Sequence, residues 1–214
     1  DVYKRQREGS TCLILSDKNI SNKKASIPSI LTVGAVHSHL VKLGLRGYCS
    51  LNVECADALD THSFAILIGV GATTVNPYLA IDSIYQRYEK ELFGKSNFES
   101  CVVKFKKSID AGLLKIMSKM GISVISSYRG GCNFEAIGLS RSVMSKYFPT
   151  MSSKISGMSL SGLENRSLAI HQKAFNENLI TLPIGGYYSY RYGGEKHAFE
   201  ATSIHMLQNA VTTN

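Results

Sequence analysis

The residue types best suited to chemistry in this chain meet in one glycine-containing stretch near its middle. The stretch comprises Ser126, Ser127, Arg129, Gly130 and Gly131. Glycines let backbone N–H groups approach a phosphate or carboxylate closely, and arginine supplies a forked cation that matches two oxygens. A packing turn between a strand and a helix uses the same glycines, and neither a complete G-x-G-x-x-G fingerprint nor a P-loop lysine is present. The loop is therefore a candidate anion site, although a packing turn is the favoured interpretation.

Histidine and cysteine, the other side chains suited to metal or nucleophile chemistry, do not form a recognisable site. His37 and His39 are two residues apart in a predicted helix, where such positions point about 200° away from each other. A shared metal site is not expected. The inner, apolar face of this helix is predicted to comprise Ile30, Val33, His37, Leu40 and Val41, so His37 is interpreted as a hydrogen-bonded core histidine. Cys132 follows Gly131 in a loop, with no histidine in the same motif to activate its thiol. We predict no catalytic, cofactor-binding or metal-binding residue in this chain.

The chain of 214 residues has 24 basic and 16 acidic residues, and its formal net charge of +8 could indicate nucleic-acid binding. Many lysines fall on one long predicted helix: Lys104, Lys106, Lys107, Lys115 and Lys119. Apolar residues of that helix recur at spacings of three and four and predict its buried face: Val102, Phe105, Ile109, Leu113, Ile116 and Met120. The lysines are then its solvated side, and Met117 borders the buried stripe. Without zinc-finger spacing or an RNP-like motif, we predict no nucleic-acid partner.

Composition also limits the setting of the protein. No run of about 18 apolar residues occurs, so no segment is expected to span a membrane. Five cysteines without a secretory leader favour a reducing, cytoplasmic location. Residues 1–9 lack an initiator methionine and are expected to lie outside the domain.

Hydrophobic periodicity, caps and turn residues predict alternating strands and helices. Predicted strands cover residues 12–16, 48–53, 73–76 and 122–125. Predicted helices cover residues 28–43, 60–68, 78–91, 102–120, 134–137, 140–147, 160–175 and 201–210. Four successive βα units indicate an α/β fold with a parallel sheet, open or partly barrel-like, and a helical and irregular C-terminal extension. Ligand or domain contacts are expected where the strands end, near Asp17, Glu54, Asn76 and residues 126–131.

Three sequence blocks point to a known family. Residues 115–123 read Lys-Ile-Met-Ser-Lys-Met-Gly-Ile-Ser, residues 127–130 read Ser-Tyr-Arg-Gly, and residues 134–139 read Phe-Glu-Ala-Ile-Gly-Leu. This run resembles a segment late in the central domain of glutamate synthase large subunits, of both the ferredoxin-dependent and the NADPH-dependent kind.

Further blocks follow in the family's order, so the resemblance covers roughly residues 11–211. They include Val-Gly-Ala-Val-His at residues 33–37 and the glycine-rich tail at residues 187–198. The departures from the family pattern are Ser38, Thr61-His62-Ser63 and Gly131-Cys132-Asn133.

The resemblance implies an enzyme that hydrolyses glutamine, channels the ammonia and adds it reductively to 2-oxoglutarate to give glutamate. Such enzymes carry an amidotransferase domain, the central domain, a barrel with FMN and a three-iron iron–sulfur cluster, and a β-helix. On this resemblance, residues 10–178 belong to the central domain and residues 179–214 start the FMN-binding domain, so the chain looks like a fragment. The implied partners are the amidotransferase and FMN-binding domains of the same polypeptide, with ferredoxin or an NADPH-oxidising small subunit supplying electrons.

Within such an enzyme this segment is expected to be non-catalytic and free of cofactor. It would set the spacing between the glutaminase and synthase sites and help to enclose the ammonia path. The family's iron–sulfur pattern is C-x5-C-x4-C; Cys49 and Cys55 match its start, but Asp60 occupies the third position. Both cysteines are therefore interpreted as packed strand residues. The alternative function is a small stand-alone α/β module that binds an anionic ligand at residues 126–131.

The C-terminal tail resembles the opening block of the flavin domain. Arg191, Glu195 and His197 match that block and are expected to pack domain against domain through charge-assisted hydrogen bonds. The tail also carries several large rings that are expected to need the flavin barrel for burial: Tyr187, Tyr188, Tyr190, Tyr192 and Phe199.

Overall fold

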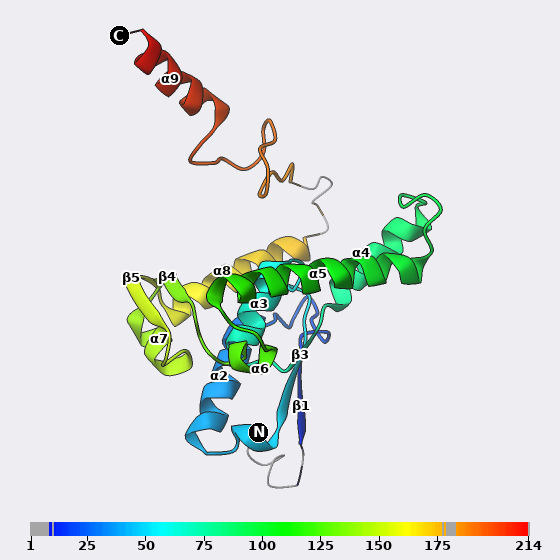
Figure 1. Ribbon diagram of the computed structural model, residues 1–214, viewed down its shortest axis with the longest axis vertical. Helices are drawn as coiled ribbons and strands as arrows, with labels where there is room; N and C mark the ends of the chain where they lie inside the picture. The colour runs from blue at the N-terminus through cyan, green and yellow to red at the C-terminus, as the bar shows by residue number, and fades with distance from the viewer. Residues whose placement is uncertain (1–8, 10, 177, 179–182, 214) are drawn as a thin grey trace. The chain divides into compact units, whose positions relative to one another are not determined.

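The computed structural model describes residues 9, 11–176, 178 and 183–213. The chain forms two compact units, the first ending at Gln172 and the second beginning at Lys173. The first unit is built on a parallel sheet with the strand order β1-β2-β3, formed by Cys12–Ser16, Ser50–Glu54 and Thr74–Asn76 (Figure 1). Three predicted strands and their parallel arrangement are confirmed. Within the described residues the sheet is open and does not close into a barrel.

The central strand β2 carries the buried face of this sheet. Leu51 and Val53 alternate with partly exposed residues along β2, and Leu51 lies opposite Leu13 of β1. Val53 lies opposite Val75 of β3 and belongs to the main hydrophobic cluster. Side chains alternate between the two faces of a strand, so this spacing directs the apolar residues toward the covering helices.

Helix α2 (Ser29–Lys42) follows β1 and covers this face through Val33 and Leu40, as the sequence predicts. Val41, predicted for the inner face, is instead 54% exposed. Ser38 takes an inward place because its short side chain donates a hydrogen bond to the Tyr147 carbonyl at 3.0 Å. The prediction for Val41 was wrong because Ser38, which makes this contact, occupies the inner face of α2 with Val33 and Leu40, and Val41 lies outside that face.

The next two helices begin at the predicted local signals. In α3 (Thr61–Gly69) the Asp60 carboxylate accepts a hydrogen bond from the Ser63 N–H at 2.8 Å, which caps the helix N-terminus. Helix α4 (Tyr78–Glu89) starts directly after Pro77, consistent with the fixed φ angle of proline.

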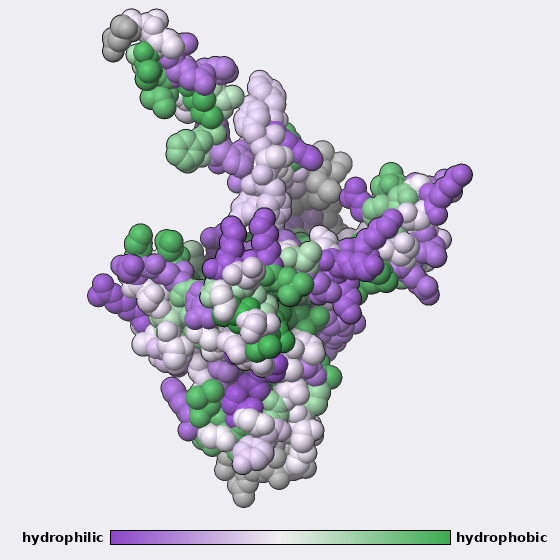
Figure 2. Space-filling model, in the orientation of Figure 1, coloured by the Kyte–Doolittle hydropathy of each residue, from purple (hydrophilic) through white to green (hydrophobic). Residues whose placement is uncertain are grey.

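Helix α5 (Phe98–Met120) is the longest helix of the described residues and packs against α3 and α4. Its five lysines are exposed, as predicted, and hydrophilic side chains cover much of α5 in Figure 2. Met120, predicted for the buried stripe, is 39% exposed, so this prediction was wrong. Met117, at the border of the predicted stripe, is only 5% exposed. Met117 packs with Ala65 and Tyr128 in a buried cluster at the end of α5. The side of the last turn that carries Met117 is therefore the buried side.

The segment after α5 differs most from the prediction. Residues 122–125 do not form a strand; the Ile122 N–H bonds back to the Met117 carbonyl and Ile125–Tyr128 form the short helix α6. Residues 134–137 were predicted as a helix, but residues 135–137 lie in strand β4 (Glu135–Leu139) and residue 134 precedes it. Gly138, the residue after the predicted helix, lies in β4 with a φ of 79°, so the chain does not continue there as a right-handed helix.

Strand β4 pairs in parallel with β5 (Ser152–Met158), a strand that the sequence analysis did not predict. Helix α7 (Arg141–Tyr147) connects them, and the Ser140 hydroxyl caps α7, close to the predicted helix 140–147. Helix α8 (Leu160–Ala174) follows, in agreement with the predicted helix 160–175. The fold is therefore α/β with two small parallel sheets among the described residues.

In the second unit, helix α9 (Ala201–Thr212) matches the predicted helix 201–210. The large rings that precede α9 in this unit are exposed; the exposed fractions of Tyr192 and Phe199 are 90% and 86%. The predicted domain boundary between residues 178 and 179 falls beside residues that the structure does not describe. Residues 1–8 of the predicted N-terminal remnant also lie outside the described residues. These domain limits stay predictions.

Candidate functional site

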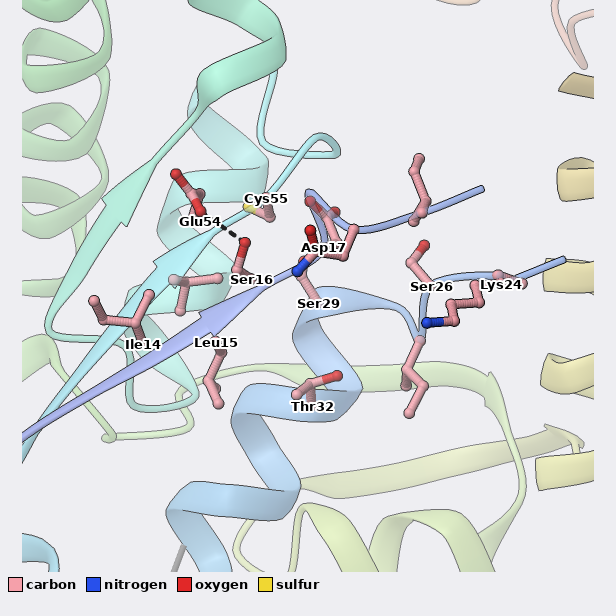
Figure 3. A pocket seen from close by; sticks show the side chains of 15 residues that line it. Ile14, Leu15, Ser16, Asp17, Lys24, Ser26, Ser29, Thr32, Glu54 and Cys55 are labelled. Carbon is pink, nitrogen blue, oxygen red and sulfur yellow. Dashed lines mark hydrogen bonds between the residues drawn. The ribbon is translucent and has the colours of Figure 1, made fainter. Parts of the chain in front are cut away.

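A hollow of about 440 Å³ lies where β1 and β2 end, as the strand-end rule predicts. Figure 3 shows Ser16 and Asp17 at the end of β1, Glu54 and Cys55 at the end of β2, and Ser29 at the start of α2. The loop between β1 and α2 forms the remaining side of this hollow. This hollow is the first candidate functional site.

Glu54 lies at the centre of a polar network at these strand ends. Its carboxylate accepts hydrogen bonds from the Ser16 hydroxyl at 2.6 Å and the Asn76 amide at 3.3 Å, and pairs with Lys18 at 2.8 Å. The hydrogen bond from Lys18, followed by that from Ser16, lowers the pKa of Glu54. Glu54 is thus held ionised and already partnered, which suits a positioning role better than proton transfer.

Two other carboxylates hold the chain around the hollow. One oxygen of Asp17 accepts the Ala56 N–H at 3.0 Å, while the other is buried and has no hydrogen-bond partner among the described residues. Asp57 accepts hydrogen bonds from the Ser29 hydroxyl at 2.7 and 2.8 Å and from the Ser29 N–H at 3.4 Å, so a carboxylate from the neighbouring loop lies at the start of α2. Partial burial and the Asp17 carboxylate raise the pKa of Tyr78.

Cys55 is the thiol at this site, and it is not suited to nucleophilic attack. Burial, with the Asp57 carboxylate as a smaller cause, raises the pKa of Cys55 to about 12. The thiolate is the reactive form of cysteine, so this thiol stays protonated and inert near neutral pH. Cys49 and Cys55 are both buried, as predicted.

The Ser126–Gly131 loop does not join these strand ends; this expectation was wrong. The Gly130 N–H bonds to the Ile68 carbonyl and the Cys132 N–H bonds to the Gly69 carbonyl, both at 3.1 Å. These bonds fasten the loop to the end of α3, which precedes the beginning of β3. Ser126 and Arg129 therefore line a second hollow at the opposite, amino-terminal edge of the sheet.

At that edge the loop meets His37 and Arg46, the latter in a single 3-10 turn, Arg46–Tyr48. The Arg46 Nε donates to His37 Nδ1 at 3.1 Å, which places the ring proton of neutral His37 on Nε2. Burial, and then the Arg46 cation, lower the pKa of His37. The predicted hydrogen bond of His37 is confirmed, but the ring is only partly buried and lines this hollow instead of lying in the core. Arg46 was missed because no local motif marks an arginine whose partners lie on several other elements.

No group of three His, Cys, Asp or Glu side chains in the described part of the chain is arranged to hold a metal ion. No helix that the structure describes is long and apolar enough to cross a membrane.

Comparison with known proteins decides the family. The sequence model described as "Glutamate synthase central domain" matches residues 1–140. The chain belongs to this family. It is 54% identical over 208 residues to the glutamate synthase [NADPH] large chain of Azospirillum brasilense, and 41% identical over 208 residues to that of Bacillus subtilis. It is also 41% identical over 216 residues to the ferredoxin-dependent glutamate synthase of Pyropia yezoensis.

These alignments cover 95–97% of this chain and 14% of each relative, so the chain spans about a seventh of their length. The departures noted in this glutamate synthase central-domain sequence have identifiable places. Ser38 bonds to the Tyr147 carbonyl, and Cys132 adopts a left-handed φ of 48° in the loop fastened to α3.

The C-terminal residues matched to the flavin-domain block lie in the second unit. Backbone bonds run from Gly194 to Arg191 and from Glu195 to Gly185, and the His197 N–H donates to the Glu200 carboxylate at 3.1 Å. Side chains of Arg191 and Glu195 are exposed. Their interdomain packing remains a prediction.

Proposed function

We propose that this chain is a non-catalytic segment of a glutamate synthase that makes glutamate from glutamine, 2-oxoglutarate and a reductant. The segment sets the spacing between the glutaminase and synthase sites and helps to enclose the path of ammonia between them. The observation that carries the proposal is the similarity of 97% of the chain to 14% of a glutamate synthase large chain, together with the match to the central-domain model.

The chemistry of the first candidate site supports a structural role. Apart from one Asp17 oxygen, its carboxylate oxygens accept hydrogen bonds or pair with Lys18, and its thiol is held protonated. Side chains that are fixed in this way position strand ends and loops, whereas a general base needs an available lone pair within hydrogen-bond reach of its substrate. We infer that this edge of the sheet shapes the backbone that faces the rest of the polypeptide.

The residues of this chain do not fit the iron–sulfur cluster of a glutamate synthase. Cys49 and Cys55 flank the extended strand β2, and six residues of extended chain span about 20 Å, too far for two ligands of one cluster. We therefore assign the cluster to other parts of the polypeptide, and we propose the same for FMN. Relatives named for NADPH and for ferredoxin are both similar to this chain, so the electron donor is not specified by the segment.

The partners we propose are the amidotransferase and FMN-binding domains of the same polypeptide, and the location we propose is cytoplasmic. Five free thiols support a reducing compartment. The residues matched to the flavin block, Arg191, Glu195 and His197, are proposed interdomain contacts.

The test compares the complete polypeptide with residues 1–214 alone. The complete polypeptide should form glutamate from glutamine and 2-oxoglutarate with a reductant and show flavin absorbance. Residues 1–214 should be colourless and inactive. Flavin absorbance or glutamate formation by the short chain would refute the non-catalytic role, and absence of glutamate synthesis by a flavin-loaded complete polypeptide would refute the enzyme assignment.

A further inference from the structure

The amino-terminal edge of the β1-β2-β3 sheet has a polar cleft of about 580 Å³ that no part of the proposed function uses. Residues from five separate segments line it, among them Thr11, His37, Arg46, Thr73, Ser126 and Arg129. The described residues of its lining thus combine two guanidinium groups with several hydroxyl donors, and none of them is an Asp or Glu.

Arg46 is fixed in the wall of this cleft by its own hydrogen bonds. Its Nη1 donates to the Cys49 carbonyl at 2.6 Å and its Nη2 donates to the Gly71 carbonyl at 2.8 Å, in addition to the Nε bond to His37. A cation held by three elements keeps its place when the neighbouring loop moves. Arg46 therefore supplies a permanent positive charge to the cleft.

Arg129 differs from Arg46 because its guanidinium makes no ion pair or side-chain hydrogen bond in the described part of the chain. It is partly buried at the end of α6. Burial, and to a smaller extent the nearby Arg129 cation, lower the pKa of Arg46, so Arg129 lies close enough to repel the Arg46 charge. Two neighbouring, partly buried cations repel each other, and an anion between them offsets that repulsion.

We propose that this cleft binds an oxyanion, a carboxylate or a phosphate, with the Arg129 guanidinium as its direct contact and Arg46 as the fixed neighbouring charge. The planar fork of an arginine pairs with two oxygens of one carboxylate or phosphate, and hydroxyls such as that of Ser126 offer a further donor. Gly130, with a φ of 70°, brings the loop backbone beside the His37 ring and leaves the Arg129 side chain at the cleft. Anion binding in this cleft is independent of the proposed function, because the short chain alone can be tested for it.

The first experiment titrates the 214-residue chain with inorganic phosphate and with oxalate at constant ionic strength, followed by amide NMR shifts and calorimetry. Constant ionic strength separates site binding from screening. Arg129→Gln should weaken binding about tenfold or more, the loss of a charge-assisted hydrogen bond. Arg141→Gln, an exposed arginine on α7 outside the cleft, is the matched control and should bind as the unchanged chain does. Circular dichroism and thermal midpoints check that both variants fold.

The second experiment identifies the source of the anion by phenylglyoxal modification of Arg129 in the complete polypeptide, read by mass spectrometry. Protection only in the presence of phosphate or oxalate identifies a free anion. Protection without added anion identifies a carboxylate of the polypeptide itself, even where the short chain binds neither probe. Equal binding by the Arg129→Gln and Arg141→Gln variants, or failure of both probes to bind together with an unprotected Arg129, would overturn the proposal.

Discussion

Two methionines one turn apart on α5 provide a matched test of the core around α5 and α6. Met117 is 5% exposed and packs with Ala65 and Tyr128, whereas Met120 is 39% exposed at the last position before Gly121. Both residues lie in the same helix, so the helix propensity gained on substitution by alanine is nearly the same. The difference between the two variants therefore reports burial.

The expected magnitudes follow from that burial. Met→Ala removes about three methylene-sized groups, worth about 2.4 kcal/mol when fully buried, and the cavity left behind raises the cost to about 2–5 kcal/mol. Met117→Ala should lose about 3 kcal/mol of the free energy of unfolding. Met120→Ala should lose about 1 kcal/mol or less, because its site opens to solvent and leaves no closed cavity.

The assay is urea unfolding of the 214-residue chain followed by far-ultraviolet circular dichroism, with equal m values required for the comparison. A Met120→Ala loss equal to or larger than the Met117→Ala loss would refute this account. That result would mean that the stripe predicted from the sequence, with Met120 inside, describes α5 better than the packing reported above.

Three further outcomes are expected. Burial and Arg46 lower the pKa of His37, so the folded state loses stability as pH falls below about 6.5, the pKa of histidine in the unfolded chain. The urea midpoint of His37→Gln should therefore fall less steeply with acidification than that of the unchanged chain. The same pH dependence in both proteins would contradict this. Gly71→Ala should cost about 2 kcal/mol or more by urea melts, because Gly71 has a φ of 123° and a Cβ would lie 2.3 Å from the His37 ring; a neutral effect would refute it. Iodoacetamide at pH 8 should label exposed Cys12 but not Cys55, whose pKa is about 12, and peptide mass spectrometry showing equal labelling would disprove the burial argument.

Local signals were enough to predict the first half of the fold. Asp60 caps α3 through its own side chain, and Pro77 precedes α4, so both helix starts depend on neighbouring residues. Asp17 and Glu54 could be placed together because parallel strands end at one edge.

Long-range contacts determined what the sequence analysis missed. The β-branched run at residues 122–125 is typical of a strand, but burial of Tyr128, whose hydroxyl donates to the Ala65 carbonyl at 3.1 Å, favours a helical turn there. Strand β5 (Ser152–Met158) is polar and exposed, so it lacks the alternation that reveals a strand. Residues 126–131 were placed at the wrong edge because their backbone bonds to α3 join segments about 60 residues apart in sequence.

The central claim, that this segment couples two active sites without performing chemistry, is tested most directly by the ratio of glutamine hydrolysed to glutamate formed. The complete polypeptide would be compared with one in which residues 11–172 are replaced by a flexible linker. We expect the altered polypeptide to keep glutamine hydrolysis and to keep glutamate synthesis from added ammonia, while synthesis that depends on glutamine is lost. Unchanged glutamine-dependent synthesis in the altered polypeptide would contradict the account.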